Sequence, residues 1–160
     1  MDQEAGRRFL RHTVATLAYR GGKALRGAPS TFGTFNAGPS TRTPGQILAH
    51  VGDLLDWALS QAEGKQRWSD SAPQAWDADV QRFFRALETL DAYLASNRPL
   101  GYPPEAIFQG AIADALTHVG QINMLRRLAG APVRGENYFK ADIVAGRVGA
   151  EQAAARKEFD

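Results

Sequence analysis

The sequence predicts an all-α protein built as a four-helix bundle. Three observations carry this prediction: four segments have apolar residues at helical spacing, proline and glycine fall between these segments, and no segment shows a convincing strand pattern. Four helices of roughly 20 residues joined by long crossover loops are typical of bundles. Because the chain has 160 residues and is 44% hydrophobic, we expect residues 1–160 to form a single domain.

The first helix is expected over residues 3–26, before Pro29. Its apolar stripe consists of Phe9, Leu10, Val14, Leu17 and Ala18. A long connection, 27–43, follows and is rich in glycine, serine, threonine and proline. It also contains Phe32 and Phe35, and two phenylalanines are unusual in a solvated linker. We therefore expect this loop to pack over one end of the domain.

The second helix is expected over 44–63, where its start is marked clearly. Thr43 and Gln46 form a capping box, and Pro44 lies at the first helical position, where a missing N–H costs nothing. The stripe that follows consists of Ile47, Val51, Leu54, Leu55, Ala58 and Leu59. After a polar connection, the third helix is expected over 75–96. Its core face consists of Val80, Phe83, Phe84, Leu87, Leu90 and Leu94.

The fourth helix is expected over 103–129, with Gly130 at its end. Its inner face consists of Ile107, Ala111, Ala115, Val119, Ile122 and Leu125. The segment from residue 133 onward is too apolar for a free tail, since it contains aromatic residues, Ile143 and Val148. We expect this C-terminal tail to pack back on the bundle, with a short last helix over 150–158.

Composition excludes several classes of function. The absence of cysteine excludes a disulfide framework, a thiolate metal site and a cysteine nucleophile. A net charge of +2 is too small to indicate a nucleic-acid partner. No stretch approaches the roughly 20 apolar residues of a membrane helix, and Arg7, Arg8 and Arg11 interrupt any apolar leader. We therefore expect a cytoplasmic protein with no membrane or nucleic-acid partner.

Polar residues interrupt the apolar faces of two helices. Asp114, His118 and Gln121 share one stripe of the fourth helix, beside its inner face. On the second helix His50 lies at the inner edge of the stripe, with Asp53 three residues on. Burying such groups without partners would cost several kcal/mol. His50, Asp114 and His118 would supply two imidazoles and one carboxylate, which is the composition of a metal site with open positions.

The same spacing is compatible with a site that holds no metal. His118 could be hydrogen-bonded by Asp114 one turn earlier, and His50 could pair with Asp53. Residue spacing leaves both interpretations open, because no pair of residues here is specific for a metal.

Two segments carry a resemblance to a known family. Residues 43–51 (TPGQILAHV) start the second helix and place His50 toward the interior, and residues 114–122 (DALTHVGQI) are similar to the pattern H-x-x-x-H-x-G-Q. In these segments and in the order of its elements, the chain resembles the DinB/YfiT-like superfamily of bacterial metal-binding four-helix bundles. The bundle resemblance covers about residues 1–130.

The resemblance implies a divalent metal, nickel or zinc, held by one histidine of the second helix and two of the fourth. His50 and His118 match two of these positions, and Asp114 stands where the family pattern has histidine. This departure leaves two interpretations. Asp114 is a ligand in its own right, or the site has lost its metal and keeps a polar remnant. Gln121 and Asp53 are candidates to orient an imidazole.

The resemblance also implies an activity. Members of the superfamily resemble S-transferases or isomerases that use a small-molecule thiol. The first hypothesis is therefore a metal-dependent transfer of a small thiol onto an electrophile, with the open coordination positions facing residues 27–43. The second is a non-enzymatic, stress-associated binding or scaffold protein with a residual polar core. We also expect a homodimer, because such bundles often pair and Trp57 falls outside the stripe of its helix.

Overall fold

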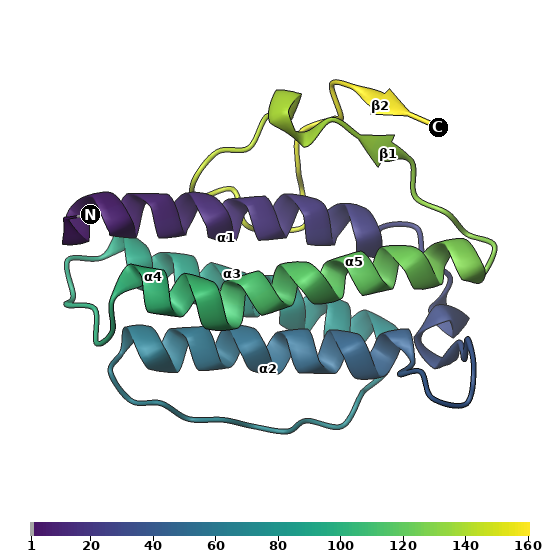
Figure 1. Cartoon of the computed structure of the whole chain (residues 1–160), viewed down its shortest axis with the longest axis horizontal. Coiled ribbons are helices and arrows are strands. Elements are labelled where there is room, and N and C mark those ends of the chain that lie inside the picture. The colour runs from purple at the N-terminus through teal and green to yellow at the C-terminus, as the bar shows by residue number, and fades with distance from the viewer. Residues whose placement is uncertain (1) are drawn as a thin grey trace.

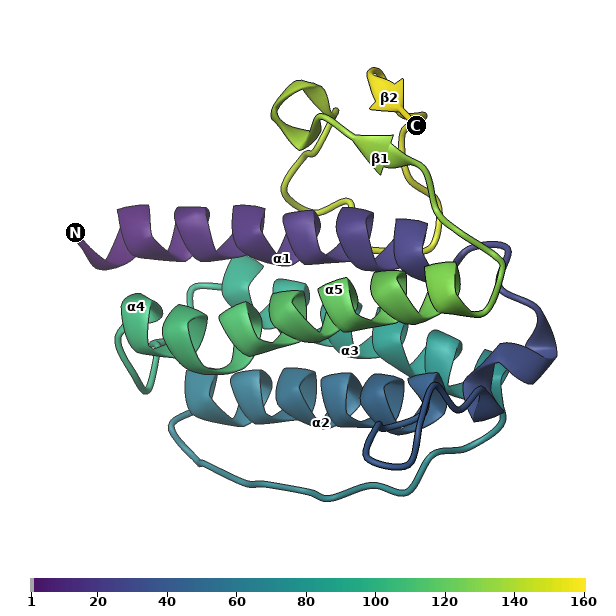
Figure 2. The same ribbon diagram turned by 45° about the vertical axis from the view of Figure 1, so that its right-hand side comes forward.

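The computed structural model describes residues 2–160 and is predominantly helical. Four long helical segments lie side by side, with α5 between α1 and α2 at the front and α3 behind them (Figures 1 and 2). Their bounds are α1 (Gln3–Leu25), α2 (Pro44–Ala62), α3 (Trp76–Ala95) and a composite last segment of α4 (Pro104–Ile107), the π-helical η2 (Phe108–Ile112) and α5 (Ala113–Leu128). The all-α class is confirmed, and the boundaries predicted for the four long helical segments each lie within one residue of the observed ones.

The start of α2 forms as its sequence predicts. The Thr43 hydroxyl accepts a hydrogen bond from the Gln46 N–H at 3.2 Å, and the Gln46 side-chain oxygen accepts one from the Thr43 N–H at 2.9 Å. Both contacts satisfy backbone donors that have no partner inside the helix. These local contacts fix where α2 begins, and therefore the position of His50 along it.

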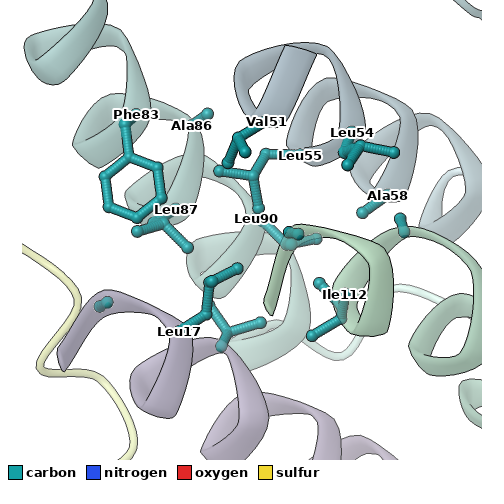
Figure 3. Packing of buried hydrophobic residues seen from close by; sticks show 14 of the residues in the cluster. Leu17, Val51, Leu54, Leu55, Ala58, Phe83, Ala86, Leu87, Leu90 and Ile112 are labelled. Atoms are coloured by element: carbon teal, nitrogen blue, oxygen red, sulfur yellow. The ribbon is translucent and has the colours of Figure 1, made fainter. Parts of the chain in front are cut away.

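The apolar stripes of the four segments meet in one core (Figure 3). Fully buried members include Leu17, Val51, Leu55, Phe83, Leu87, Leu90 and Ile112. The prediction that Phe9 belongs to this core is wrong, since its side chain is 54% exposed and packs edge-on against Phe108. Leu10 lies about 100° further round the helix and takes the inner position.

The loop over residues 27–43 packs over one end of the helices, as expected. It contains a short 3₁₀ helix, η1 (Ser30–Thr34), whose Phe32 is buried and lies edge-on against Trp76 at 5.2 Å between ring centroids. This anchor holds the start of the loop, and the remainder returns along α2 toward Thr43 (Figure 2). Arg42, near the end of this loop, lines a cavity together with His50 of α2.

The C-terminal segment folds back over α1, as predicted (Figures 1 and 2). It contains β1 (Gly135–Glu136), the 3₁₀ helix η3 (Tyr138–Lys140) and β2 (Glu158–Phe159), and β1 pairs with β2 in antiparallel register. Val148 is buried against the helices.

The predicted last helix over 150–158 is wrong, because no described residue after η3 is helical. The segment has residues that favour a helix, but an isolated helix of about nine residues is marginal in water. Its backbone pairs instead with the earlier part of the tail, and the Lys157 carbonyl accepts a hydrogen bond from the Asn137 N–H at 2.9 Å. The Gln152 side chain donates to the Gly149 carbonyl at 2.8 Å, which stabilises the non-helical path.

A buried carboxylate ties this tail to α1. The Glu136 side chain is fully buried, accepts a hydrogen bond from the Tyr19 hydroxyl and forms an ion pair with Lys23 at 2.8 Å. Lys23 also contacts Glu158 at 3.1 Å. Burial and the hydrogen bond to Glu136 both raise the pKa of Tyr19. A raised pKa stabilises the fold below the ordinary tyrosine value of about 10, so this contribution is lost as the pH rises above that value.

Glu136→Ala is expected to release the tail while leaving the helices folded. The change removes the partner of two buried donors, each contact contributing about 1.5–3 kcal/mol, so trypsin should cleave the tail at Arg147 at least about tenfold faster. Limited proteolysis followed by mass spectrometry measures the rate. Glu158→Ala is the control. The Glu158 side chain is 32% exposed and, of Tyr19, Lys23 and Glu136, contacts only Lys23, so its removal should raise the cleavage rate less. Equal rates for Glu136→Ala and the wild type would contradict the proposed tie.

Within the described part of the chain, no helix has the length and apolar character needed to cross a membrane.

Candidate metal centre

α2 and α5 bring His50, Asp114 and His118 together. The two imidazole rings lie 4.7 Å apart between centroids, and Asp114 reaches both: its carboxylate lies 3.7 Å from His50 Nε2 and 3.2 Å from His118 Nδ1. Each residue offers one ligand atom, and these atoms all lie within 4.8 Å of one another. Ligand atoms of a tetrahedral site with bonds of 2.0–2.2 Å are separated by about 3.3–3.6 Å. Small side-chain rotations would close the difference, so this group could hold a metal ion.

A π-helical turn directly precedes the two ligand candidates of the last helix. The sequence predicted one uninterrupted helix over 103–129, whereas η2 replaces α-helical geometry over Phe108–Ile112. A π turn inserts an extra residue and so changes which face the following residues present. Asp114 and His118 follow it one turn apart. Gly110 lies in this turn, where a Cβ atom would sit 3.6 Å from the Trp57 ring. In the sequence, the available indication of this irregular turn is a glycine inside a helical pattern.

The orientation of the His118 ring is set by its own helix. Its Nδ1 lies 2.8 Å from the Asp114 backbone carbonyl, which can only accept a hydrogen bond. We therefore assign the proton to Nδ1, which leaves the lone pair on Nε2. Metal-binding histidines are commonly held through one ring nitrogen in this way. The predicted contact between His118 and Asp114 is therefore present, through both the carbonyl and the carboxylate.

Asp53 has a different role from the predicted one. Its buried carboxylate accepts hydrogen bonds from the Ser71 N–H at 2.8 Å, the Ser71 hydroxyl at 2.7 Å and the Arg82 guanidinium at 2.7 Å. Burial acts to raise the pKa of Asp53, but these hydrogen bonds and the Arg82 charge outweigh it and lower the pKa. The prediction that Asp53 pairs with His50 or orients its ring is wrong, because stronger donors from outside the helix take this carboxylate.

The contacts of Asp53 fix the connection between α2 and α3 against α2. Trp68 lies in the same connection, three residues before Ser71, and its ring lies edge-on to His50 at 5.6 Å and to Trp57 at 5.9 Å between centroids. Sequence reasoning missed Trp68 as a neighbour of the site, since no spacing rule links a loop residue to a helix that precedes it by 18 positions.

Two cavities flank the three residues. One, of about 580 Å³, is lined by His118 and Gln121, and the other, of about 390 Å³, is lined by His50. Arg42 lines both. Gln121, predicted as a candidate to orient an imidazole, is exposed at the surface of the larger cavity. The loop over 27–43 thus contributes a cationic side chain beside the centre, which the sequence alone did not indicate.

Comparisons of the chain with protein-family models, with curated proteins and with solved structures find no match.

Proposed function

We propose that His50, Asp114 and His118 bind one divalent metal, nickel or zinc, inside a four-helix bundle of the DinB/YfiT-like type. The observation that carries this proposal is the convergence of three donor atoms from two helices within 4.8 Å. Imidazole nitrogen suits zinc and nickel, and a carboxylate is an ordinary third ligand of zinc. The orientation of His118 by the Asp114 carbonyl supports the same assignment.

For the activity we propose the transfer of a small-molecule thiol onto an electrophile. A divalent metal with open positions would favour the thiolate form of a bound thiol and so supply a nucleophile at neutral pH. The thiol would give its proton to water, and its sulfur would bond to the electrophile. In a substitution the bond between the electrophile and its leaving group would break and the leaving group would take up a proton from water, whereas in an addition a π bond of the electrophile would open and the adduct would take up that proton. The chain itself contributes the ring orientation of His118, the Trp68 ring beside His50 and two cavities from which reactants can approach.

One observation favours the second candidate, a non-enzymatic binding or scaffold protein with a residual polar core. His118 already has two partners within its own helix, the Asp114 carbonyl at 2.8 Å and the Asp114 carboxylate at 3.2 Å. These contacts satisfy one ring nitrogen with no metal present.

Zinc and nickel titration of the metal-free protein by calorimetry separates the two candidates. We expect one metal per chain at micromolar affinity or tighter, and His118→Ala should weaken binding by at least about 100-fold because it removes a direct ligand. His12→Ala is the matched control, because His12 is an exposed histidine of α1 and should leave the affinity unchanged. Asp114→Ala tests whether the carboxylate is a ligand. If the wild type binds neither metal at micromolar levels, the proposed metal centre is wrong and the second candidate function remains.

The homodimer stays a prediction. Trp57, which suggested it, packs within its own chain against Trp68 and Gly110. Light scattering at high micromolar concentration tests the association.

A further inference from the structure

The larger cavity has an apolar wall that the proposed metal chemistry does not explain. It lies between the loop residues Ala37–Arg42 and the surface of α5, and its volume of about 580 Å³ falls in the usual range for small-molecule sites. Met124 and Leu128, spaced one turn apart on α5, line it together with Leu125 and Ile47. Met124 and Leu128 are each 59% exposed. Exposed apolar side chains gathered in a cavity mark a binding site more often than scattered ones do.

The charge of this cavity is one-sided. Among the described residues that line it, Arg42 is the only lysine, arginine, aspartate or glutamate, so no carboxylate of the described chain lines it. The ion pairs of the described residues do not include Arg42. A planar guanidinium with no acidic partner matches a carboxylate, which it can bind through two parallel hydrogen bonds. The single positive charge also fits a ligand with a single negative charge.

We propose that this cavity binds an apolar carboxylic acid. Arg42 holds the carboxylate, and Met124, Leu128 and their neighbours take the hydrocarbon body. The proposal goes beyond the metal centre, because the apolar wall and Arg42 are present whether or not His50, Asp114 and His118 bind a metal. Arg42 also lines the cavity beside His50, so a carboxylate held there lies at the boundary between the two sides of the candidate centre.

The sequence offers a specific probe for this cavity. The chain has two methionines, Met1 and Met124, so labelling with methyl-¹³C methionine gives one NMR signal from inside the chain. Metal-free protein in the presence of a chelator is titrated with sodium octanoate and, separately, with neutral octanamide. We expect octanoate to shift the Met124 methyl signal in a saturable manner and to bind at least about fivefold more tightly than octanamide, as an exposed ion pair allows.

Three variants separate the roles of charge and wall. Arg42→Gln should reduce octanoate binding to the level of octanamide, and Leu128→Gln should weaken both ligands together. Arg85→Gln is the matched control, because Arg85 is an exposed arginine of α3 and does not line the cavity; it should change neither affinity. Equal binding of the two ligands to the wild type, or an Arg42→Gln variant that keeps its preference for octanoate, would overturn the proposal. An unchanged Met124 signal would do the same.

A further arm distinguishes this proposal from the metal centre. The octanoate titration is repeated after zinc is added. If octanoate binds only to the zinc-treated protein, the carboxylate contacts the metal and the assignment to Arg42 is wrong. If the protein binds no zinc while octanoate still shifts the Met124 signal in the metal-free protein, the proposed metal centre is wrong and the proposed carboxylate site is supported.

Discussion

Replacing Arg7 with methionine is expected to lower the free energy of unfolding by about 3–4 kcal/mol. The Arg7 side chain extends from α1 to the end of α3, where its guanidinium donates hydrogen bonds to the backbone carbonyls of Leu94 at 3.3 Å and Ser96 at 3.1 Å, and also to that of Arg98. The last carbonyls of a helix accept no hydrogen bond from an N–H group of that helix, so they need donors from elsewhere. A buried cation also complements the negative end of the helix dipole. Methionine keeps the packing volume but leaves these carbonyls without donors.

Chemical denaturation of the wild type and the variant measures this loss. Arg8→Met is the control from the neighbouring position, because the Arg8 side chain is 68% exposed and its ion pair with Glu4, the only one it forms among residues 2–160, is 3.8 Å long. We expect the control to lose less than about 0.5 kcal/mol. Equal losses in the two variants would show that the carbonyl contacts of Arg7 do not contribute as described.

Asp53→Ala is expected to cost about 3 kcal/mol and to release Trp68 from the site. The change leaves three donors from Ser71 and Arg82 without their buried acceptor, although the exposed carboxylate of Asp56 still contacts Arg82 at 2.7 Å. Because these contacts hold the connection after α2, Trp68, which is already 51% exposed, should lose its contacts with the His50 and Trp57 rings, and the tryptophan emission of the folded variant should change. The unfolding midpoint in urea and the emission spectrum measure the two effects. Asp56→Ala is the control, since Asp56 is 54% exposed and should lose less than about 1 kcal/mol.

The contribution of Asp53 also predicts a pH dependence. Arg82 and Ser71 lower the pKa of Asp53 below its ordinary value, against the effect of burial. A lowered pKa stabilises the fold above the ordinary aspartate value of about 3.9, and this stability is lost as the pH falls through the lower value of the folded state. The difference in unfolding free energy between wild type and Asp53→Asn should therefore shrink below about pH 4. A difference that stays constant down to pH 2 would contradict this role.

A second variant tests the contacts between Asp53 and Arg82 without removing a charged group. A Cβ atom on Gly52 would lie 2.8 Å from the Arg82 guanidinium. Gly52→Ala should therefore displace Arg82 from Asp53, and the expected gain of about 0.5–1 kcal/mol from replacing a glycine inside a helix should be reduced or reversed. If Asp53→Ala fails to fold, this variant still tests the network.

The helices and their limits follow from local information, which is why the sequence predicted them well. The start of α2 depends on Thr43, Pro44 and Gln46, which are neighbours in the chain, and its buried face depends on residues spaced by one turn. The choice of His50, Asp114 and His118 as a group used the same periodicity, which indicates that a polar side chain lies at an inner edge. The tertiary structure adds that α2 and α5 are adjacent at that height, so that the three donors converge.

Features that depend on contacts between distant segments were wrong or missing in the prediction. Residues 150–158 have the composition of a helix, yet they stay non-helical and only their last two residues contact the β1 region, because a short segment gains more from backbone partners already held in place than from an isolated turn. Asp53 binds Arg82 and Ser71 rather than His50, and Arg42 reaches both cavities. Local spacing cannot predict these pairings, because charged groups take the partners that the packing of whole helices and loops brings within a few ångströms. A buried charge such as Asp53 or Glu136 needs such a partner to offset the cost of its burial.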